Sequence, residues 1–273
     1  MNFFAKPFRV FACLALGIGL LCAVVHEQRA RQEQQAAYRY LGSLPPELVL
    51  ECRAAGLQIA PDAWIDLLAI RSTVATAAES EGEHGWQAVL AGEGWESARS
   101  LFSDGEAQRL EERRRFLAKY PLFQSGRFSF PVQGNPWYVD TYGADREGGS
   151  RKHEGTDLFS PEGTPVINVA AGKVERLGWN RLGGERVGVR GDDGVYYYYA
   201  HLKEINPSLK IGQKIERNAW IGGVGHTGDA ITTPDHLHFG MQLPDGEWLN
   251  PYAFLVVWEH DQQVGNEKFQ QNF

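Results

Sequence analysis

An apolar segment without charged residues occupies positions 10–25 of the chain. Lys6 and Arg9 precede this segment, and several charged residues follow it directly. Basic residues ahead of an apolar run are typical of a secretory signal peptide or a signal anchor. Because no convincing small-x-small cleavage site precedes the charged segment, the pattern favours an uncleaved membrane-anchor helix in residues 1–26. The rest of the chain is then expected outside the cytoplasm.

Apolar positions recur at helical spacing through much of residues 27–125. The first part, up to about residue 42, is polar and predicts a helical continuation or a stalk. Proline and aspartate mark helix starts, and glycine and proline mark helix ends. These signals predict three helices, which begin near Pro45-Pro46, near Pro61-Asp62 and at a capping Asp104. We find no catalytic constellation here, and we interpret the segment as a helical stalk or spacer.

The pattern changes near residue 126, where short alternating runs separated by glycine-containing turns replace helical spacing. Residues 163–169 and 172–179 are predicted strands. Residues 185–190 and 195–200 should pair as a hairpin across an Asp-Gly turn. Short strands with frequent turns predict a mainly antiparallel β domain over residues 126–259, followed by a C-terminal tail at 260–273.

Composition narrows the possible chemistry. The 273 residues carry a formal net charge of −7, which argues against nucleic acid as a partner, because nucleic-acid binders normally present a basic face. Two of the three cysteines lie in the apolar segment, which leaves Cys52 alone in the remainder. A single thiol forms no internal disulfide, and the chain contains no Cys-x-x-Cys pair. Any bound metal must therefore be held by histidine and carboxylate side chains.

Four of the eight histidines fall in three short stretches of the predicted β domain. His236 and His238 are two positions apart in a predicted strand and therefore share a face. His153 and Asp157, four apart, share a face in either a strand or a helix, and an intervening glycine would let the backbone bend towards a metal. A catalytic zinc ion takes three protein ligands and keeps one position open.

His153, Asp157 and one member of the His236/His238 pair form such a ligand set. The other member and His201 remain for proton transfer, so the spacing favours a zinc hydrolase over unrelated surface histidines.

Three motifs resemble, in order and spacing, those of the lysostaphin-type zinc endopeptidases of bacterial cell walls. They are His153-x-x-x-Asp157, Tyr199-Ala200-His201-Leu202 and His236-Leu237-His238-Phe239. The resemblance covers about residues 128–257 and implies a mostly antiparallel β fold with an open groove.

The resemblance assigns the zinc ligands to His153, Asp157 and His238, and the catalytic pair to His201 and His236. It also makes Tyr142 the nearest candidate for a groove tyrosine that steadies the transition state. Two positions beside the last motif, Asp235 and Gly240, depart from the usual proline and glutamate, but neither is a ligand position.

The implied function is a zinc-dependent endopeptidase that hydrolyses peptide bonds in peptidoglycan stem peptides or cross-bridges. The last motif looks most like a branch that includes enzymes cutting the L-Ala–D-Glu bond. The expected partners are peptidoglycan peptides and, through the N-terminal helix, the membrane. The expected location is the cell membrane, with the catalytic domain on the extracytoplasmic side, in the periplasm or the cell wall.

Two alternatives belong to other classes. Some members of this family have lost ligands and act as scaffolds or activators of other wall hydrolases, but here all five positions are filled. A metal-dependent hydrolase of a phosphoester is disfavoured by the acidic chain and by the lack of a phosphate-binding glycine loop with Lys or Arg.

Overall fold

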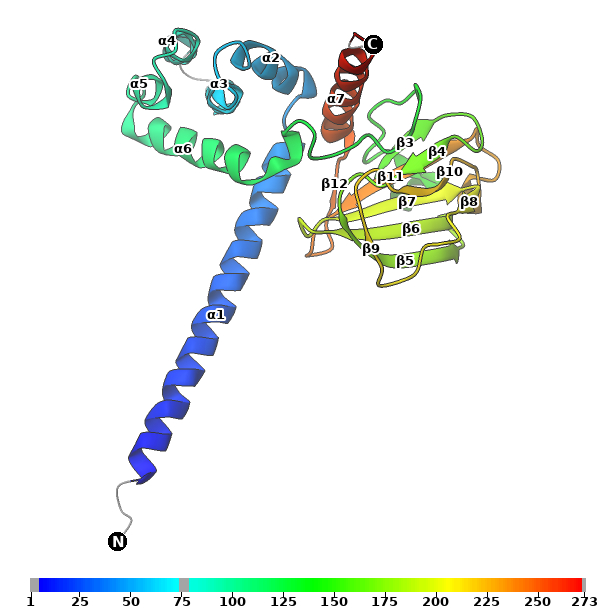
Figure 1. The fold of residues 1–273 in the computed structure, drawn as a ribbon, viewed down its shortest axis with the longest axis horizontal. Helices are drawn as coiled ribbons and strands as arrows, with labels where there is room; N and C mark the ends of the chain where they lie inside the picture. The colour runs from blue at the N-terminus through cyan, green and yellow to red at the C-terminus, as the bar shows by residue number, and fades with distance from the viewer. Residues whose placement is uncertain (1–4, 74–78, 272–273) are drawn as a thin grey trace.

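The computed structural model describes the backbone of residues 5–73 and 79–271, and the side chains of residues 20–73 and 81–264. It shows a helical region beside a β domain, with one long N-terminal helix extending away from both (Figure 1). The helical region comprises α1 (Ala5–Gly42), α2 (Pro46–Gly56), α3 (Ala63–Thr73), α4 (Glu79–Leu90), α5 (Trp95–Arg99) and α6 (Asp104–Lys119). The predicted order, a helical region followed by an antiparallel β domain, is confirmed.

The predicted anchor segment, residues 10–25, forms part of α1. Most of it falls on positions 1–19, whose side chains lie outside the described residues. Within the described part of the chain, no helix is both long enough and apolar enough to cross a membrane.

Proline, glycine and aspartate positions in the sequence predicted helix boundaries close to those in the structure. α2 begins at Pro46, as the sequence predicts, and ends at Gly56. The predicted cap of α6 is wrong by one residue, because Asp104 is already helical and Ser103 occupies the N-cap. Serine is a favoured N-cap residue, and the Ser103 hydroxyl donates to Glu106 Oε2 (2.5 Å), which ties the cap to the first turn of the helix.

The β domain is built on a seven-stranded antiparallel sheet. Its strands follow the order β12-β11-β7-β6-β5-β9, and β3 also pairs with β11. The predicted hairpin is confirmed as β6 with β7. The sheet contains β3 (Thr156–Phe159), β5 (Gly172–Asn180), β6 (Gly184–Gly191), β7 (Tyr196–Leu202), β9 (Lys214–Ile215), β11 (His236–Gln242) and β12 (Trp248–Leu249).

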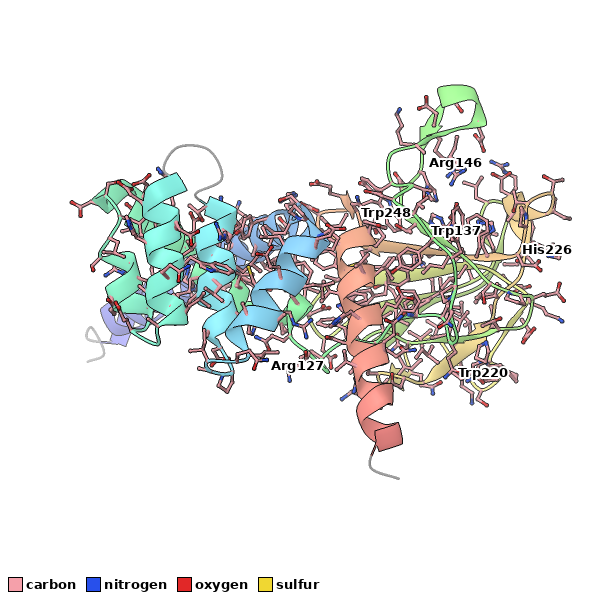
Figure 2. All side chains as sticks on the ribbon, turned by 90° about the horizontal axis from the view of Figure 1, so that it is seen from above. Arg127, Trp137, Arg146, Trp220, His226 and Trp248 are labelled. Carbon is pink, nitrogen blue, oxygen red and sulfur yellow. The ribbon has the colours of Figure 1, made fainter. Side chains whose placement is uncertain are left out.

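Two smaller sheets complete the β domain. One has the order β4-β10-β8, and the other pairs β1 with β2 in a segment that projects beside the main sheet (Figure 2). Their strands are β1 (Asp145–Arg146), β2 (Arg151–Lys152), β4 (Pro165–Ile167), β8 (Glu204–Ile205) and β10 (Trp220–Gly223). Three short 3₁₀ turns, η1 (Pro121–Phe123), η2 (Glu147–Gly149) and η3 (Gly228–Ala230), lie between the longer elements.

The C-terminal helix α7 (Tyr252–Gln271) joins the two regions and continues across position 259, where the sequence pattern of the β domain ends. Figure 1 shows α7 between the helical region and the sheet. Trp258 stacks on Phe128 with ring centroids 5.0 Å apart and donates its indole N–H to the Leu122 carbonyl (2.8 Å). The buried core therefore runs without interruption from the helices into the sheet.

Arg53 of α2 holds α7 through a buried ion pair. One guanidinium nitrogen lies 2.5 Å from Asp261 Oδ1, and the two side chains are only 8% and 12% exposed. Removing one partner from a buried pair leaves an uncompensated charge. We expect Arg53→Met to lower the free energy of unfolding by about 3 kcal/mol, measured by urea denaturation.

A control comes from Arg39, which pairs with Asp245 at the surface with its side chain 40% exposed. Arg39→Met should lower the free energy of unfolding by less than about 1 kcal/mol. Equal effects of the two substitutions would contradict the structural role given to Arg53.

Candidate metal centre and active site

Three side chains bring one ligand atom each to a common point. His153 Nε2 lies 3.0 Å from Asp157 Oδ1 and 2.9 Å from His238 Nδ1, and the remaining edge of the triangle is 3.1 Å. His238 stands directly opposite Asp157 in the β11–β3 pair, so strand register brings these two together. His153 lies between β2 and β3. Its side chain reaches Asp157 and His238 because the chain bends at Gly155.

Backbone carbonyls fix the ring orientation at this point. His153 donates its Nδ1–H to the Thr141 carbonyl (2.8 Å), because a carbonyl oxygen can only accept. The Nε2 lone pair therefore faces Asp157 and His238. Such a carbonyl partner is the usual way in which a metal-binding histidine is held in one tautomer.

The geometry of this triangle fits a metal ion. In a tetrahedral site with bonds of about 2.0–2.1 Å, the ligand atoms lie roughly 3.3 Å apart, a few tenths of an ångström more than here. Two imidazoles and one carboxylate are a common donor set for a catalytic zinc ion. The structure thus brings together the three residues predicted as ligands.

His236 lies beside the triangle on the same face of β11 as His238. It donates Nδ1–H to the Pro234 carbonyl (2.8 Å), and its Nε2 lies 3.8 Å from Asp157 Oδ1. The histidine therefore directs an unprotonated nitrogen towards the triangle, in a position to exchange a proton rather than to complete the closest set of ligands.

His201 reaches the same place by a different route. Strand alternation would put it on the buried face with Tyr197 and Tyr199, which are fully buried. The β6–β7 register instead shifts between Glu185 and Val187, and His201 adopts a left-handed backbone with φ of 61°. A bulge of this kind redirects a side chain, and functional residues often adopt such conformations.

The redirected His201 ring lies 5.0 Å from the His236 ring, centroid to centroid. It donates Nδ1–H to the Thr227 carbonyl (2.8 Å), which leaves Nε2 free. Burial, together with the neighbouring His238 and His236, lowers the pKa of His201 to about 3. The ring is therefore neutral at physiological pH, and Nε2 presents a lone pair to the site.

Asp157 is held as a carboxylate. Burial alone would raise its pKa, but the adjoining His153 and His238 rings outweigh burial and hold the pKa well below its ordinary value. The second oxygen, Oδ2, accepts a hydrogen bond from Arg146 at 2.6 Å. Arg146 belongs to the projecting β1–β2 segment, which the sequence analysis did not connect with the site (Figure 2).

Arg146 fixes which oxygen of Asp157 faces the two histidines. We expect Arg146→Met to weaken metal affinity by about 10- to 100-fold, the usual effect of removing a group that orients a ligand. Competition with a chelator of known affinity would measure this. The control is Lys152→Met, which removes a positive charge from the same segment but whose ammonium contacts the exposed Asp145. An unchanged affinity in Arg146→Met would contradict the orienting role.

The five site residues line a groove of about 540 Å³. Tyr198 and Trp248 also line it, and their rings lie 6.0 Å apart. Tyr142, the expected groove tyrosine, is not among the described residues that line it, and its hydroxyl donates instead to the Trp248 carbonyl (2.6 Å). The described tyrosines that line the groove are Tyr196 and Tyr198, which sequence reasoning did not place there, although Tyr198 stands in the Tyr-Tyr-Ala-His motif.

A second group of potential ligands lies at the surface. His226 Nδ1 is 2.6 Å from Asp235 Oδ1 and 3.7 Å from Glu162 Oε2, while Lys203 holds the other Glu162 oxygen at 2.7 Å. Because a lysine already compensates one carboxylate, we interpret this group as an ion-pair network.

Comparison with known proteins identifies the β domain. A sequence profile described as peptidase family M23 matches residues 151–251, the span that contains all five site residues. The β domain of this chain is therefore an M23-type peptidase domain. It is similar to the L-Ala–D-Glu endopeptidase of Bacillus subtilis, with 42% identity over 141 residues, which cover 48% of this chain and 43% of that protein.

Lysostaphin of Staphylococcus simulans is 38% identical over 89 residues, which cover 32% of this chain and 17% of lysostaphin. The chain thus spans less than half the length of these curated relatives. Among solved structures, a Ruminococcus gnavus protein named as a glycyl-glycine endopeptidase aligns with a TM-score of 0.50 at 25% identity. That alignment covers 70% of this chain and 87% of the other, so it extends beyond the M23 domain.

Proposed function

We propose that this protein is a zinc-dependent endopeptidase that hydrolyses peptide bonds in peptidoglycan stem peptides or cross-bridges. The L-Ala–D-Glu bond is the first candidate. The observation that carries the proposal is the convergence of His153, Asp157 and His238 in an open groove, with two further histidines directing free nitrogens at the same place. The name of the 42% identical relative supports the choice of bond.

In this proposal His153, Asp157 and His238 bind zinc, and His201 and His236 are the catalytic pair. A zinc ion at this point would lower the pKa of a bound water to about 7 and polarise the scissile carbonyl. The rings of His201 and His236 lie 5.0 Å apart, centroid to centroid, beside the ligand triangle. One of them can accept the proton of the attacking water, and the ring protonated in this way can then donate that proton to the leaving amine.

A scaffold or activator role would not need this complete arrangement. Pairing of three histidine Nδ1–H groups with backbone carbonyls keeps three Nε2 atoms directed at the groove. Such preorganisation serves catalysis rather than binding alone.

Mass spectrometry of muropeptides after incubation with the full-length protein tests the proposal. New fragments that end at L-Ala and begin at D-Glu are expected with the zinc-loaded protein and not with the metal-stripped protein. Cleavage at a different peptide bond would correct the substrate. Intact muropeptides with zinc fully bound would favour the scaffold alternative.

We also propose that residues 1–26 anchor the protein to the membrane and that residues 27–125 act as a stalk or spacer. The catalytic unit would then be residues 126–259, followed by the tail at 260–273, in the periplasm or cell wall. The basic residues ahead of the apolar segment support this arrangement. Fractionation of cells that produce the full chain tests it, and full-length protein in the cytosolic fraction would contradict it.

A further inference from the structure

The groove is rich in arginine, although the chain as a whole is acidic. Its lining includes Arg146, Arg151, Arg176 and Arg186, whereas the formal net charge of the chain is −7. The groove lining also carries three carboxylates, Glu154, Asp157 and Asp229. Asp157 belongs to the proposed ligand set, and a bound divalent ion would add two positive charges. The groove lining would then carry a net positive charge.

Two of these arginines already have partners. Arg146 binds Asp157 at 2.6 Å, and Arg151 lies 3.5 Å from Asp229. Arg176 and Arg186 have no carboxylate within 4.0 Å among the residues whose side chains are described. The Nε atom of Arg186 is buried and lacks any hydrogen-bond acceptor. A buried guanidinium donor without an acceptor is costly unless a ligand supplies one.

Strand register places these two arginines together on the floor of the groove. Arg186 of β6 stands opposite Gly178 of β5, and Arg176 stands opposite Gly188, one step along the same face. Tyr198 of β7 is the next residue in the row after Gly188, and its ring centroid lies 6.0 Å from that of His238. The floor therefore runs from the ligand triangle over Tyr198 to the arginine pair.

Strand spacing sets the distance between this row and the ligand triangle. Adjacent strands are about 4.8 Å apart, so the backbone of β6 lies roughly 10 Å from that of β11, with β7 between them. A long arginine side chain that extends from this row towards β11 covers much of this separation, so its guanidinium can approach a group bound beside the ligand triangle.

We propose that Arg176 and Arg186 form a subsite for a free carboxylate on the peptide substrate, close to the scissile bond. The inference rests on the proposed endopeptidase function and specifies the substrate class of the same site. A glutamyl residue linked through either of its carboxyl groups keeps the other one free. The planar guanidinium matches a carboxylate in a two-point hydrogen bond, which a neutral carboxamide cannot replace at equal strength. The subsite thus selects acidic peptides against their amidated counterparts.

The test uses two synthetic peptides that contain an L-Ala–D-Glu bond. They differ only in whether the free carboxyl of the D-Glu residue is a carboxylate or a carboxamide. The measured quantity is the ratio of kcat/KM for the two peptides with the full-length, zinc-loaded protein. We expect a ratio of about ten or more in favour of the carboxylate, the scale of one charge-assisted hydrogen bond.

Arg186→Gln and Arg176→Gln should each lower this ratio, and the double variant should bring it close to one. Arg186→Lys should keep part of the preference for the carboxylate peptide. The positive charge remains, but the planar guanidinium that makes two parallel hydrogen bonds is lost. The control is Arg190→Gln on the same strand, which removes a guanidinium that Glu175 already holds at 2.8 Å. An unchanged ratio is expected there, and a fall equal to that of Arg186→Gln would overturn the assignment.

A second readout separates this inference from the proposed function. Calorimetric titration of the metal-stripped protein with the same peptides measures binding without turnover. Tighter binding of the carboxylate peptide, abolished by Arg176→Gln/Arg186→Gln, would support the subsite even if neither peptide were cut. Equal binding and equal cleavage of both peptides would overturn it while leaving an endopeptidase. Displacement of the carboxylate peptide by inorganic phosphate at similar concentrations would indicate a general anion site and would also overturn it.

Discussion

Alanine in place of His238 should remove the metal, whereas alanine in place of His236 should leave the metal bound and abolish turnover. The two histidines are neighbours on one face of β11, yet only His238 Nδ1 lies within about 3 Å of both other ligand atoms. His236 Nε2 stands 3.8 Å from Asp157, and its other ring nitrogen is committed to the Pro234 carbonyl. The distances therefore distinguish two residues that their spacing in the sequence left equivalent.

His238→Ala leaves two ligands, so zinc should fall well below one per chain, and the stability that the metal contributes should be lost with it. His236→Ala should keep zinc near one per chain, while cleavage of wall peptides falls by roughly 100-fold or more, the usual effect of losing a general acid or base. We expect His201→Ala to behave like His236→Ala. His153→Ala and Asp157→Ala should behave like His238→Ala.

Zinc content, melting temperature and turnover of the five variants decide between these roles. Zinc loss in His236→Ala with retention in His238→Ala would reverse the assignment of the pair. Full activity in either variant would remove that residue from the mechanism. A melting temperature unchanged in His238→Ala, with zinc lost, would show that the metal adds nothing to the fold.

Some residues of the site could be placed from the sequence by a local rule, and others could not. Residue spacing was enough to place the side chains of His236 and His238 on one face of a strand. Strand alternation is a local rule, and β11 follows it. The same rule fails for His201, which only a left-handed residue in a bulge turns into the groove. Its assignment from sequence came from elimination among the clustered histidines and from motif resemblance, since no propensity of Tyr-Ala-His-Leu predicts a bulge.

Residues on separate segments were harder to place. Arg146 and Asp157 meet because the β1–β2 segment folds over β3, and no spacing in the sequence encodes that contact. Arg176 and Arg186 reach one face through β5–β6 register, which a shift between Val174 and Arg176 also affects. The helical region was predicted well near its prolines, where local chemistry dominates. Its contact with α7 depends on long-range packing and was not predicted.

Replacing Gly155 with alanine is expected to disrupt the metal site without touching any ligand. A Cβ atom at this position would lie 2.4 Å from the Phe239 carbonyl oxygen and 2.8 Å from His238 Nε2. Both distances are well below van der Waals contact, and one neighbour is strand backbone that cannot move alone. The His238 ring, or the bend that carries His153, must therefore shift.

A displacement of about 1 Å in a positioned group can lower activity by 100-fold. We therefore expect Gly155→Ala to lose most of its zinc affinity and at least 100-fold in turnover, measured by chelator competition and peptide cleavage. Gly105→Ala is the matched control, because a Cβ atom there meets nothing within 4 Å and the residue lies in helix α6. Since alanine favours helix over glycine, that variant should be at least as stable as the original protein and equally active. Wild-type zinc affinity in Gly155→Ala would mean that β11 and the bend at residue 155 can separate freely, and that the close approach of the two segments does not hold His238 in place.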